Sequence, residues 1–172
     1  MVHSGDYMVP TSGGETTITK PPLHYWVLCG VMLLGGVGDL EGLEELDPRW
    51  LRLPSLLGFW ALSWVVFLVL RRSHGPGAGW ASAVGILLAP VILHEGPTAE
   101  IDPLFASLTG VSLVLLAQGV SFCERRWLVV GGVAGGFALL SKGPPYFLFL
   151  AGPTLVWLRH RRLWAAPYFT LP

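Results

Sequence analysis

Charge is scarce in this chain. Only 13% of its 172 residues are charged, whereas 52% are hydrophobic. A soluble domain of this length needs more charged residues to cover its surface, so the composition indicates an integral membrane protein. Eleven acidic residues balance eleven Lys and Arg residues, which leaves no basic surplus. A nucleic-acid-binding protein concentrates basic residues on one face, so we expect no nucleic-acid partner.

Cysteine is also scarce. Cys29 and Cys123 show no spacing typical of a disulfide framework or a metal site, and we interpret them as packed or inert thiols. His94 and Glu95 are adjacent metal-ligand types without a matching second pair. We therefore expect no metal and no cofactor, with a divalent cation at these two residues as the alternative. Residues 1–22 lack a basic segment followed by an apolar one, which argues against a signal peptide or a membrane helix there.

Apolar segments separated by charged or turn-forming residues fill the rest of the chain. A helix needs about 20 residues to cross a bilayer core of about 30 Å. We predict an all-α polytopic membrane protein with about five transmembrane helices and one interfacial or re-entrant helix, at residues 23–38. Residues 1–50 would form a non-cytoplasmic loop carrying that helix, and residues 51–172 the transmembrane domain. The predicted spans are 51–70, 75–93, 104–122, 127–140 and 146–158.

Basic residues are unevenly distributed between the connections. The segments 71–72, 125–126 and 159–162 carry seven of the eleven Lys and Arg residues, and the one acid beside them is Glu124. The positive-inside rule places these segments in the cytoplasm and the acid-rich segments outside. Both ends of residues 23–38 then lie outside, which favours an interfacial or re-entrant helix over a full span. If this helix did cross, the orientation of every later loop would invert.

Ionisable residues are missing from the centres of the predicted spans. Proton-coupled transporters usually place such residues at mid-membrane depth. Here the charged residues lie at the outer ends of the helices, which favours an enzyme whose substrate meets it at the outer membrane surface.

Four short elements bring charge to this outer face: "TKPPL", "RLPS", "TAEIDP" and "LLSKGPP". A basic residue at a helix end often reaches the lipid head groups without further function, and the carboxylates could instead stabilise a helix N-terminus. Alternatively, the basic residues bind a lipid phosphate and a carboxylate binds or deprotonates a hydroxyl. The candidate substrate-binding residues are Lys20, Arg52, Glu100, Asp102 and Lys142.

Lys142 joins the two shortest predicted spans. A 14-residue helix reaches only about 21 Å at 1.5 Å per residue, so this turn is expected below the bilayer surface. A lysine there could contact a lipid phosphate without drawing the lipid out of the membrane.

The motifs "GDYMVPTSGGETTITKPPLHYW", "RLPSLL", "AEIDPLF" and "LLSKGPP" occur in this order along the chain. Together they resemble the N-terminal membrane region of C-type glycosyltransferases, in particular the aminoarabinose-transferase-like and dolichyl-phosphate-mannose protein mannosyltransferase-like group. The similarity extends from about residue 4 to about residue 158.

This resemblance implies a partial C-type glycosyltransferase fold and an enzyme that takes a sugar from a polyprenyl-phosphate carrier. The acceptor would be a lipid, glycan or protein at the non-cytoplasmic face of what we expect to be a bacterial inner membrane. Lys20 and Lys142 match the lysines of the family motifs that bind donor phosphate, and Asp102 matches the aspartate beside the active site. The implied partners are a polyprenyl-phosphate-sugar lipid and the surrounding membrane lipids.

The sequence departs from the family pattern in three places. The family places a membrane helix and an acidic loop, with the presumed catalytic base, before the motif that here contains Asp6. Met1 lies only five residues before Asp6, so the base expected upstream of Met1 is absent from this sequence. No catalytic residue is assigned, and we expect a fragment that is inactive alone. Pro97 stands where many members have arginine, and Thr19 where they tend to have an acid. The alternatives are a non-catalytic polyprenyl-phosphate-binding module and a transporter or scaffold subunit.

Overall fold

The computed structural model describes the backbone of residues 11–12, 15–16, 21–37, 47, 49–95 and 100–165, and side chains within 21–37, 47, 49–94 and 100–155. The described chain is almost entirely helical, apart from a short antiparallel pair of strands in which Thr11 pairs with Thr16 and Ser12 with Glu15. The strands are β1 (Thr11–Ser12) and β2 (Glu15–Thr16), and the helices are α1 (Leu23–Leu34), α3 (Arg49–His74), α4 (Pro76–Leu87), α5 (Pro90–Glu95), α6 (Ile101–Ser121), α7 (Arg125–Lys142) and α8 (Pro145–Ala165).

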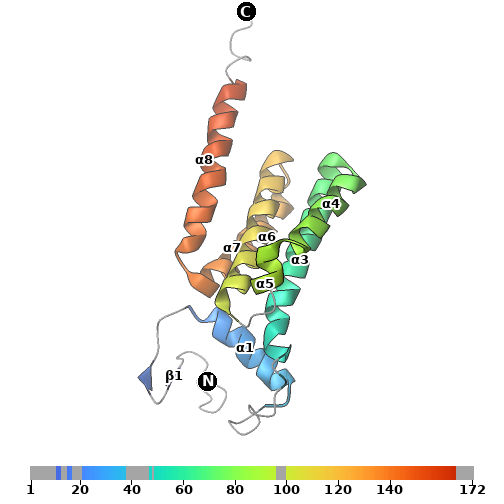
Figure 1. The fold of residues 1–172 in the computed structure, drawn as a ribbon. Coiled ribbons are helices and arrows are strands. Elements are labelled where there is room, and N and C mark those ends of the chain that lie inside the picture. The colour runs from blue at the N-terminus through green and yellow to red at the C-terminus, as the bar shows by residue number, and fades with distance from the viewer. Residues whose placement is uncertain are drawn as a thin grey trace, which may run out of the picture.

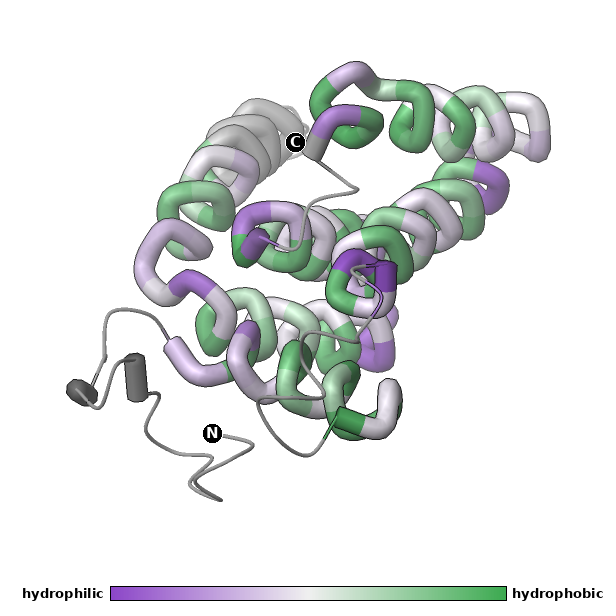
Figure 2. Tube along the Cα trace, turned by 60° about the horizontal axis from the view of Figure 1, so that its bottom comes forward, coloured by the Kyte–Doolittle hydropathy of each residue, from purple (hydrophilic) through white to green (hydrophobic). Residues whose placement is uncertain are grey.

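The central layer of the molecule consists of α3, α6 and α7, with α4 against α3 and α8 diverging from the bundle (Figure 1). Among the described helices, α3 and α6 are long and apolar enough to cross a membrane, whereas α1 and residues 145–155 of α8 are shorter apolar helices. Hydrophobic residues, shown in green, run along the helices, and hydrophilic ones occupy short patches (Figure 2). Large apolar side chains such as Leu57 and Leu148 are exposed. Such a surface suits a lipid environment.

Four predicted spans correspond to single helices, but residues 75–93 do not. The segment contains α4, a break at Leu88 and Ala89, and the short helix α5. Pro90 explains the break, because proline lacks the N–H that a continuing helix requires and disfavours helical geometry at the residue before it. The prediction of one continuous helix over 75–93 is therefore wrong, and α4 with 12 residues extends only about 18 Å.

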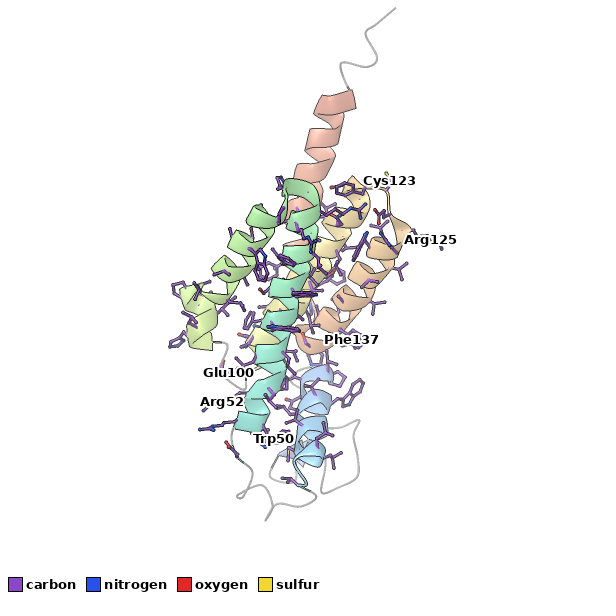
Figure 3. All side chains as sticks on the ribbon, turned by 90° about the vertical axis from the view of Figure 1, so that its right-hand side faces the viewer. Trp50, Arg52, Glu100, Cys123, Arg125 and Phe137 are labelled. Atoms are coloured by element: carbon purple, nitrogen blue, oxygen red, sulfur yellow. The ribbon has the colours of Figure 1, made fainter. Side chains whose placement is uncertain are left out.

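Helix α1 lies past the end of α7, beside the first turns of α3 (Figures 1 and 3). Its 12 residues also extend about 18 Å, well short of a bilayer core. The helix ends at Leu34, four residues before the predicted limit, and its interfacial or re-entrant placement stays a prediction.

The two ends of the bundle differ in charge. Cys123 and Arg125 lie at one end, and Trp50, Arg52 and Glu100 at the other (Figure 3). We call the first the arginine end, because the ends of α3 and α8 and the start of α7 bring all three Arg-rich segments there (Figure 1). The opposite end, where α6 begins and α7 ends, is the lysine end. This common location of the Arg-rich segments agrees with the sequence prediction, although residues 159–162 belong to α8 rather than to a loop.

Glu124 organises the arginine end. It accepts hydrogen bonds from Arg72, from Arg126 Nε at 2.8 Å and from Trp127 Nε1 at 2.7 Å. The hydrogen bond from the Arg72 guanidinium, followed by that from Arg126, lowers the pKa of the Glu124 carboxyl to about 2. One carboxylate thus joins the end of α3 to the start of α7.

Small residues allow the central helices to approach closely, as in many membrane helix bundles. A Cβ on Gly58 would lie 2.4 Å from Ser107 Oγ, and one on Gly135 would lie 2.2 Å from the Tyr146 hydroxyl. Ser112 Oγ lies 2.7 Å from both the Gly131 carbonyl and the Tyr146 hydroxyl. These buried hydrogen bonds connect α8 to the middle of α6 and α7, and so help to fix the helices whose ends form the candidate site.

Candidate functional site

The connection between α7 and α8 fixes the position of Lys142. Helix α7 ends at Lys142, and Gly143 follows with φ 79° and ψ −134°, a conformation that residues with a Cβ strongly disfavour. The Gly143 N–H donates to the Leu139 carbonyl at 2.8 Å, and Pro145 begins the next helix. Lys142 therefore stays at a helix C-terminus, where a positive charge interacts favourably with the helix dipole.

Asp102 lies at the opposite kind of helix terminus. It is the second residue of α6, where a carboxylate interacts favourably with the N-terminal end of the helix. Glu100 occupies the N-cap position, but its side chain forms no capping hydrogen bond. The sequence left open that these carboxylates only stabilise the helix N-terminus. Asp102 can do so from its position in the first turn, whereas Glu100 does not do so by capping.

An ion pair joins these two helix ends. Lys142 Nζ donates to Asp102 Oδ1 at 2.6 Å across 40 positions of sequence, and the ammonium also lies 5.8 Å from the centre of the Phe105 ring. The side chains are 39% and 58% exposed, respectively. An ion pair this accessible contributes about 0 to 1 kcal/mol, so a ligand phosphate can replace the carboxylate at little cost.

The ion pair lies at the edge of a cleft of about 430 Å³ between α6 and the first turns of α8. One face of α6 forms a wall, because its lining residues follow helical spacing. Those residues are Asp102, Phe105, Ala106, Thr109, Gly110 and Leu113. Pro145 and Phe149 close the other side. The cleft thus combines a charged entrance with apolar and aromatic walls, an arrangement suited to an amphiphile with an anionic head.

A second apolar groove continues from this cleft along α6. It shares Leu113 with the cleft, has a volume of about 210 Å³, and extends between α6 and α8 to Val120 and Pro153. Its direction runs from the lysine end towards the arginine end. A chain bound in both grooves would therefore lie along the apolar length of the bundle.

The remaining predicted binding residues do not take part in the Lys142–Asp102 ion pair as far as the structure describes them. Arg52 is exposed in the first turn of α3 and points away from the bundle, with no ion pair to a described residue (Figure 3). Glu100 is also exposed at this end, two residues from Asp102. Lys20 lies outside the described residues. Pro21, which follows it in sequence, packs near Gly143, where an added Cβ would be 3.6 Å from Pro21 Cγ.

The catalytic base stays unassigned. The family resemblance places this base upstream of Met1, and Met1 itself lies outside the described residues. The described residues therefore do not test the expectation of a missing base, and the candidate site consists of binding residues alone.

Metal binding at the lysine end remains a prediction from sequence. Within the described part of the chain, no three His, Cys, Asp or Glu side chains gather into a potential metal site. The side chain of Glu95 lies outside the described residues, so the possible pairing of His94 with Glu95 is not tested.

Sequence reasoning did not identify two aromatic residues of the cleft, Phe105 and Phe149. A signal for Phe105 was available, because a residue three positions after Asp102 lies on the same helix face. Phe149 has no such signal, since its position depends on the angle between α8 and α6.

Comparison with known proteins identifies the family to which this chain belongs. The model of the dolichyl-phosphate-mannose-protein mannosyltransferase family matches residues 19–171. An undecaprenyl phosphate-alpha-4-amino-4-deoxy-L-arabinose arabinosyl transferase from Pseudomonas savastanoi pv. phaseolicola is 28% identical over 168 residues, or 95% of this chain and 29% of the relative. An uncharacterized protein from Aquifex aeolicus is 26% identical over 162 residues, or 92% of this chain and 30% of that protein.

Solved structures show the same fold. ArnT from Cupriavidus metallidurans in the apo state gives a TM-score of 0.77 at 23% identity, covering 97% of this chain and 31% of ArnT. The same protein bound to undecaprenyl phosphate gives 0.74 at 25% identity, covering 93% and 28%. This chain thus spans about three tenths of the length of these relatives. The agreement of motifs, helical fold and family match shows that the chain belongs to the dolichyl-phosphate-mannose-protein mannosyltransferase family of C-type glycosyltransferase-like membrane proteins.

Proposed function

We propose that this chain forms the donor-phosphate-binding part of a glycosyltransferase that uses a polyprenyl-phosphate-linked sugar. The observation that carries the proposal is the Lys142–Asp102 ion pair at the entrance of an apolar cleft. Family membership and the likeness to a protein crystallised with undecaprenyl phosphate support this substrate class. The acceptor is a lipid, glycan or protein, and transfer takes place at the non-cytoplasmic face of a bacterial inner membrane.

The proposed role of Lys142 follows from the charge that develops during transfer. The bond between the sugar and the donor phosphate oxygen breaks, and its electron pair remains on that oxygen. The acceptor oxygen bonds to the sugar and releases its proton to the base, which is not assigned to a residue of this chain. A fixed ammonium beside the phosphate stabilises the growing negative charge, which is the most effective use of a preorganised cation.

Asp102 has a separate proposed role. Before the donor binds, its carboxylate pairs with Lys142 at the cleft entrance and favours this position of the ammonium. The arriving phosphate displaces this carboxylate, which is then free to interact with a hydroxyl of the sugar or acceptor. Because both side chains are exposed, a ligand phosphate can reach Lys142 and displace the carboxylate.

The polyprenyl chain would occupy the apolar grooves. Phe105 and Phe149 line the cleft, and Leu113 connects the cleft with the groove along α6 and α8. Burial of a hydrocarbon chain there adds affinity in proportion to the apolar area removed from water.

Three further residues complete the proposed site. We assign Lys20 as a second phosphate ligand on the basis of the family motif, and the packing of Pro21 beside Gly143 supports this assignment. Arg52 and Glu100 are assigned to substrate contacts further from the ion pair, at the same end of the bundle.

Binding of undecaprenyl phosphate to the 172-residue chain in lipid nanodiscs tests this proposal. A charge-assisted hydrogen bond contributes about 1.5 to 3 kcal/mol, so Lys142→Gln should weaken binding about tenfold to hundredfold. Arg49→Gln is the matched control, because Arg49 is exposed at the same end and pairs only with Asp47 among the described residues. Equal affinity of wild type and Lys142→Gln would refute the phosphate-ligand assignment.

Sugar transfer is a separate measurement, made on the longer protein that carries this segment. Transfer that depends on Lys142 supports the enzyme. Phosphate binding without transfer by an intact longer protein would instead indicate the non-catalytic binding module.

A further inference from the structure

A third groove lies between α3 and α4, separate from the cleft at Lys142. It has a volume of about 190 Å³, and α3 and α4 contribute an aromatic lining. The principal lining residues are Trp60, Trp64, Phe67, Trp80, Val84 and Leu87. The three tryptophans are exposed by 60%, 47% and 58%, respectively. Such a set of open indole faces has no role in the proposed transfer reaction.

Close packing of the two helices creates this groove. A Cβ on Gly79 would lie 2.9 Å from the Phe67 carbonyl oxygen, so the backbones approach closely at this point. Ser63 Oγ also donates to the Ala83 carbonyl at 3.0 Å. Because small residues fill the contact line, the large aromatic side chains lie beside it and leave a groove open along the surface.

The aromatic rings form a continuous surface. Trp60 and Trp64 stack at 6.1 Å with 9° between their planes, and Trp64 lies 5.3 Å from Phe67. Phe67 lies 4.7 Å from Trp80 on α4. This surface runs lengthwise down α3 from the arginine end, and a flat aromatic strip of this kind can accommodate a flexible hydrocarbon chain.

Arg71 ends the strip. Its guanidinium carbon lies 5.8 Å from the centre of the Phe67 ring. The local carboxylate, Glu124, already accepts hydrogen bonds from Arg72 and Arg126. No acidic side chain among the described residues pairs with Arg71, so its charge remains available to an anion at the end of the groove.

From the arginine end inwards, the charged residue, the boundary indole and the deeper indoles of the groove follow the same order as the phosphate, glycerol region and acyl chain of a phospholipid. Helical rise places Trp64 about 10 Å and Trp60 about 16 Å below Arg71, at hydrocarbon depth. Trp80 is one turn into α4, about 6 Å from its start, where an indole suits the polar–apolar boundary of the lipid. No described residue accepts a hydrogen bond from the Trp80 indole N–H, which is thus available to a lipid ester carbonyl.

We propose that this groove binds one anionic phospholipid from the leaflet at the arginine end. Its phosphate pairs with Arg71, its glycerol region lies at Trp80, and an acyl chain packs on Trp64 and Trp60. The unneutralised charge of Arg71 favours an anionic head group over a zwitterionic one. The positive-inside rule places this end at the cytoplasmic leaflet, where anionic lipids attract basic residues.

Quenching of tryptophan fluorescence by acyl-chain-brominated lipids tests the proposal on the 172-residue chain in detergent micelles. Brominated phosphatidylglycerol should quench at about fivefold lower concentration than brominated phosphatidylcholine, since a basic residue near a charged lipid surface contributes about 1 kcal/mol. Arg71→Gln should abolish this preference, and Arg71→Lys should retain it. Arg125→Gln is the matched control, because Arg125 lies at the same end on the opposite side from α4 (Figure 3).

The location of the lipid is tested separately. Trp64→Phe should remove part of the quenched fluorescence, whereas Trp127→Phe should not, because Trp127 lies outside the groove and bonds to Glu124. An equal response to both lipids, or an unchanged preference in Arg71→Gln, would overturn the proposal. Absence of quenching with either lipid, together with cross-linking between copies through the groove, would assign the surface to a second copy instead.

Discussion

Replacement of Asp102 by Asn should strengthen the binding of undecaprenyl phosphate. The amide preserves the size of the side chain but removes its negative charge. In the structure the carboxylate neutralises Lys142 at 2.6 Å, so an arriving phosphate must displace it. Removing this competitor leaves the ammonium free for the ligand.

The size of the effect follows from two contributions. An exposed ion pair such as this one contributes about 0 to 1 kcal/mol, which the phosphate no longer has to overcome. Repulsion between a carboxylate and a phosphate about 4 Å apart adds about 1 kcal/mol in a water-like environment. The sum of about 1 to 2 kcal/mol corresponds to roughly fivefold to thirtyfold tighter binding. Because both contributions are electrostatic, the gain should shrink as salt is added.

Calorimetric titration of undecaprenyl phosphate into the chain in nanodiscs measures this change. Glu100→Gln serves as the matched control, because it removes the same charge two residues away and Glu100 forms no ion pair with a described residue. Its gain should be smaller. Unchanged or weaker binding by a folded Asp102→Asn variant would refute the displacement model. It would show that the carboxylate contributes favourably to the bound state, for example through a cation.

Two further predictions concern stability. Gly135→Ala should lower the free energy of unfolding by about 1 to 3 kcal/mol, because the new methyl group would lie 2.2 Å from the Tyr146 hydroxyl, whereas Gly136→Ala, with open space around its Cβ, should be neutral or stabilising. Equal denaturation midpoints for the two variants in detergent would contradict this packing. Glu124 has a folded pKa lowered to about 2, chiefly by Arg72, so its contribution to stability is fully present above the ordinary pKa of about 4.5 and is lost as the pH falls towards 2. Thermal unfolding between pH 6 and 2 should show this loss of stability in wild type and not in Glu124→Gln. If the melting temperatures of the two proteins fell in parallel with pH, the loss would not come from Glu124.

Local sequence signals located most of the helices correctly. Helices α3, α7 and α8 each contain one predicted span, and α6 contains all of another except Phe122. A long apolar segment in a membrane satisfies its backbone hydrogen bonds most readily as a helix. The failure at residues 75–93 has a local cause as well. Pro90 was visible in the sequence, but the surrounding apolar residues suggested continuity, and hydropathy does not register a missing N–H donor.

Contacts between distant residues could not be predicted in the same way. Asp102 and Lys142 were both candidates, yet their pairing depends on α6 and α7 packing side by side along small residues. Phe149 enters the cleft only because α8 turns back at Gly143 and Pro145. The aromatic groove likewise depends on the close approach of α4 to α3.

The sequence alone determined which residues are charged at each end of the bundle, because a bilayer excludes charge from the middle of its helices and thereby segregates it at their ends. It also determined where along the chain most of the helices lie, although their limits differ from the predicted ones by up to seven residues. Only the tertiary structure decided which lysine meets which carboxylate and which apolar faces remain open. Those outcomes depend on helix crossing angles and on close contacts at residues such as Gly79 and Gly135, which act across the bundle rather than along the chain.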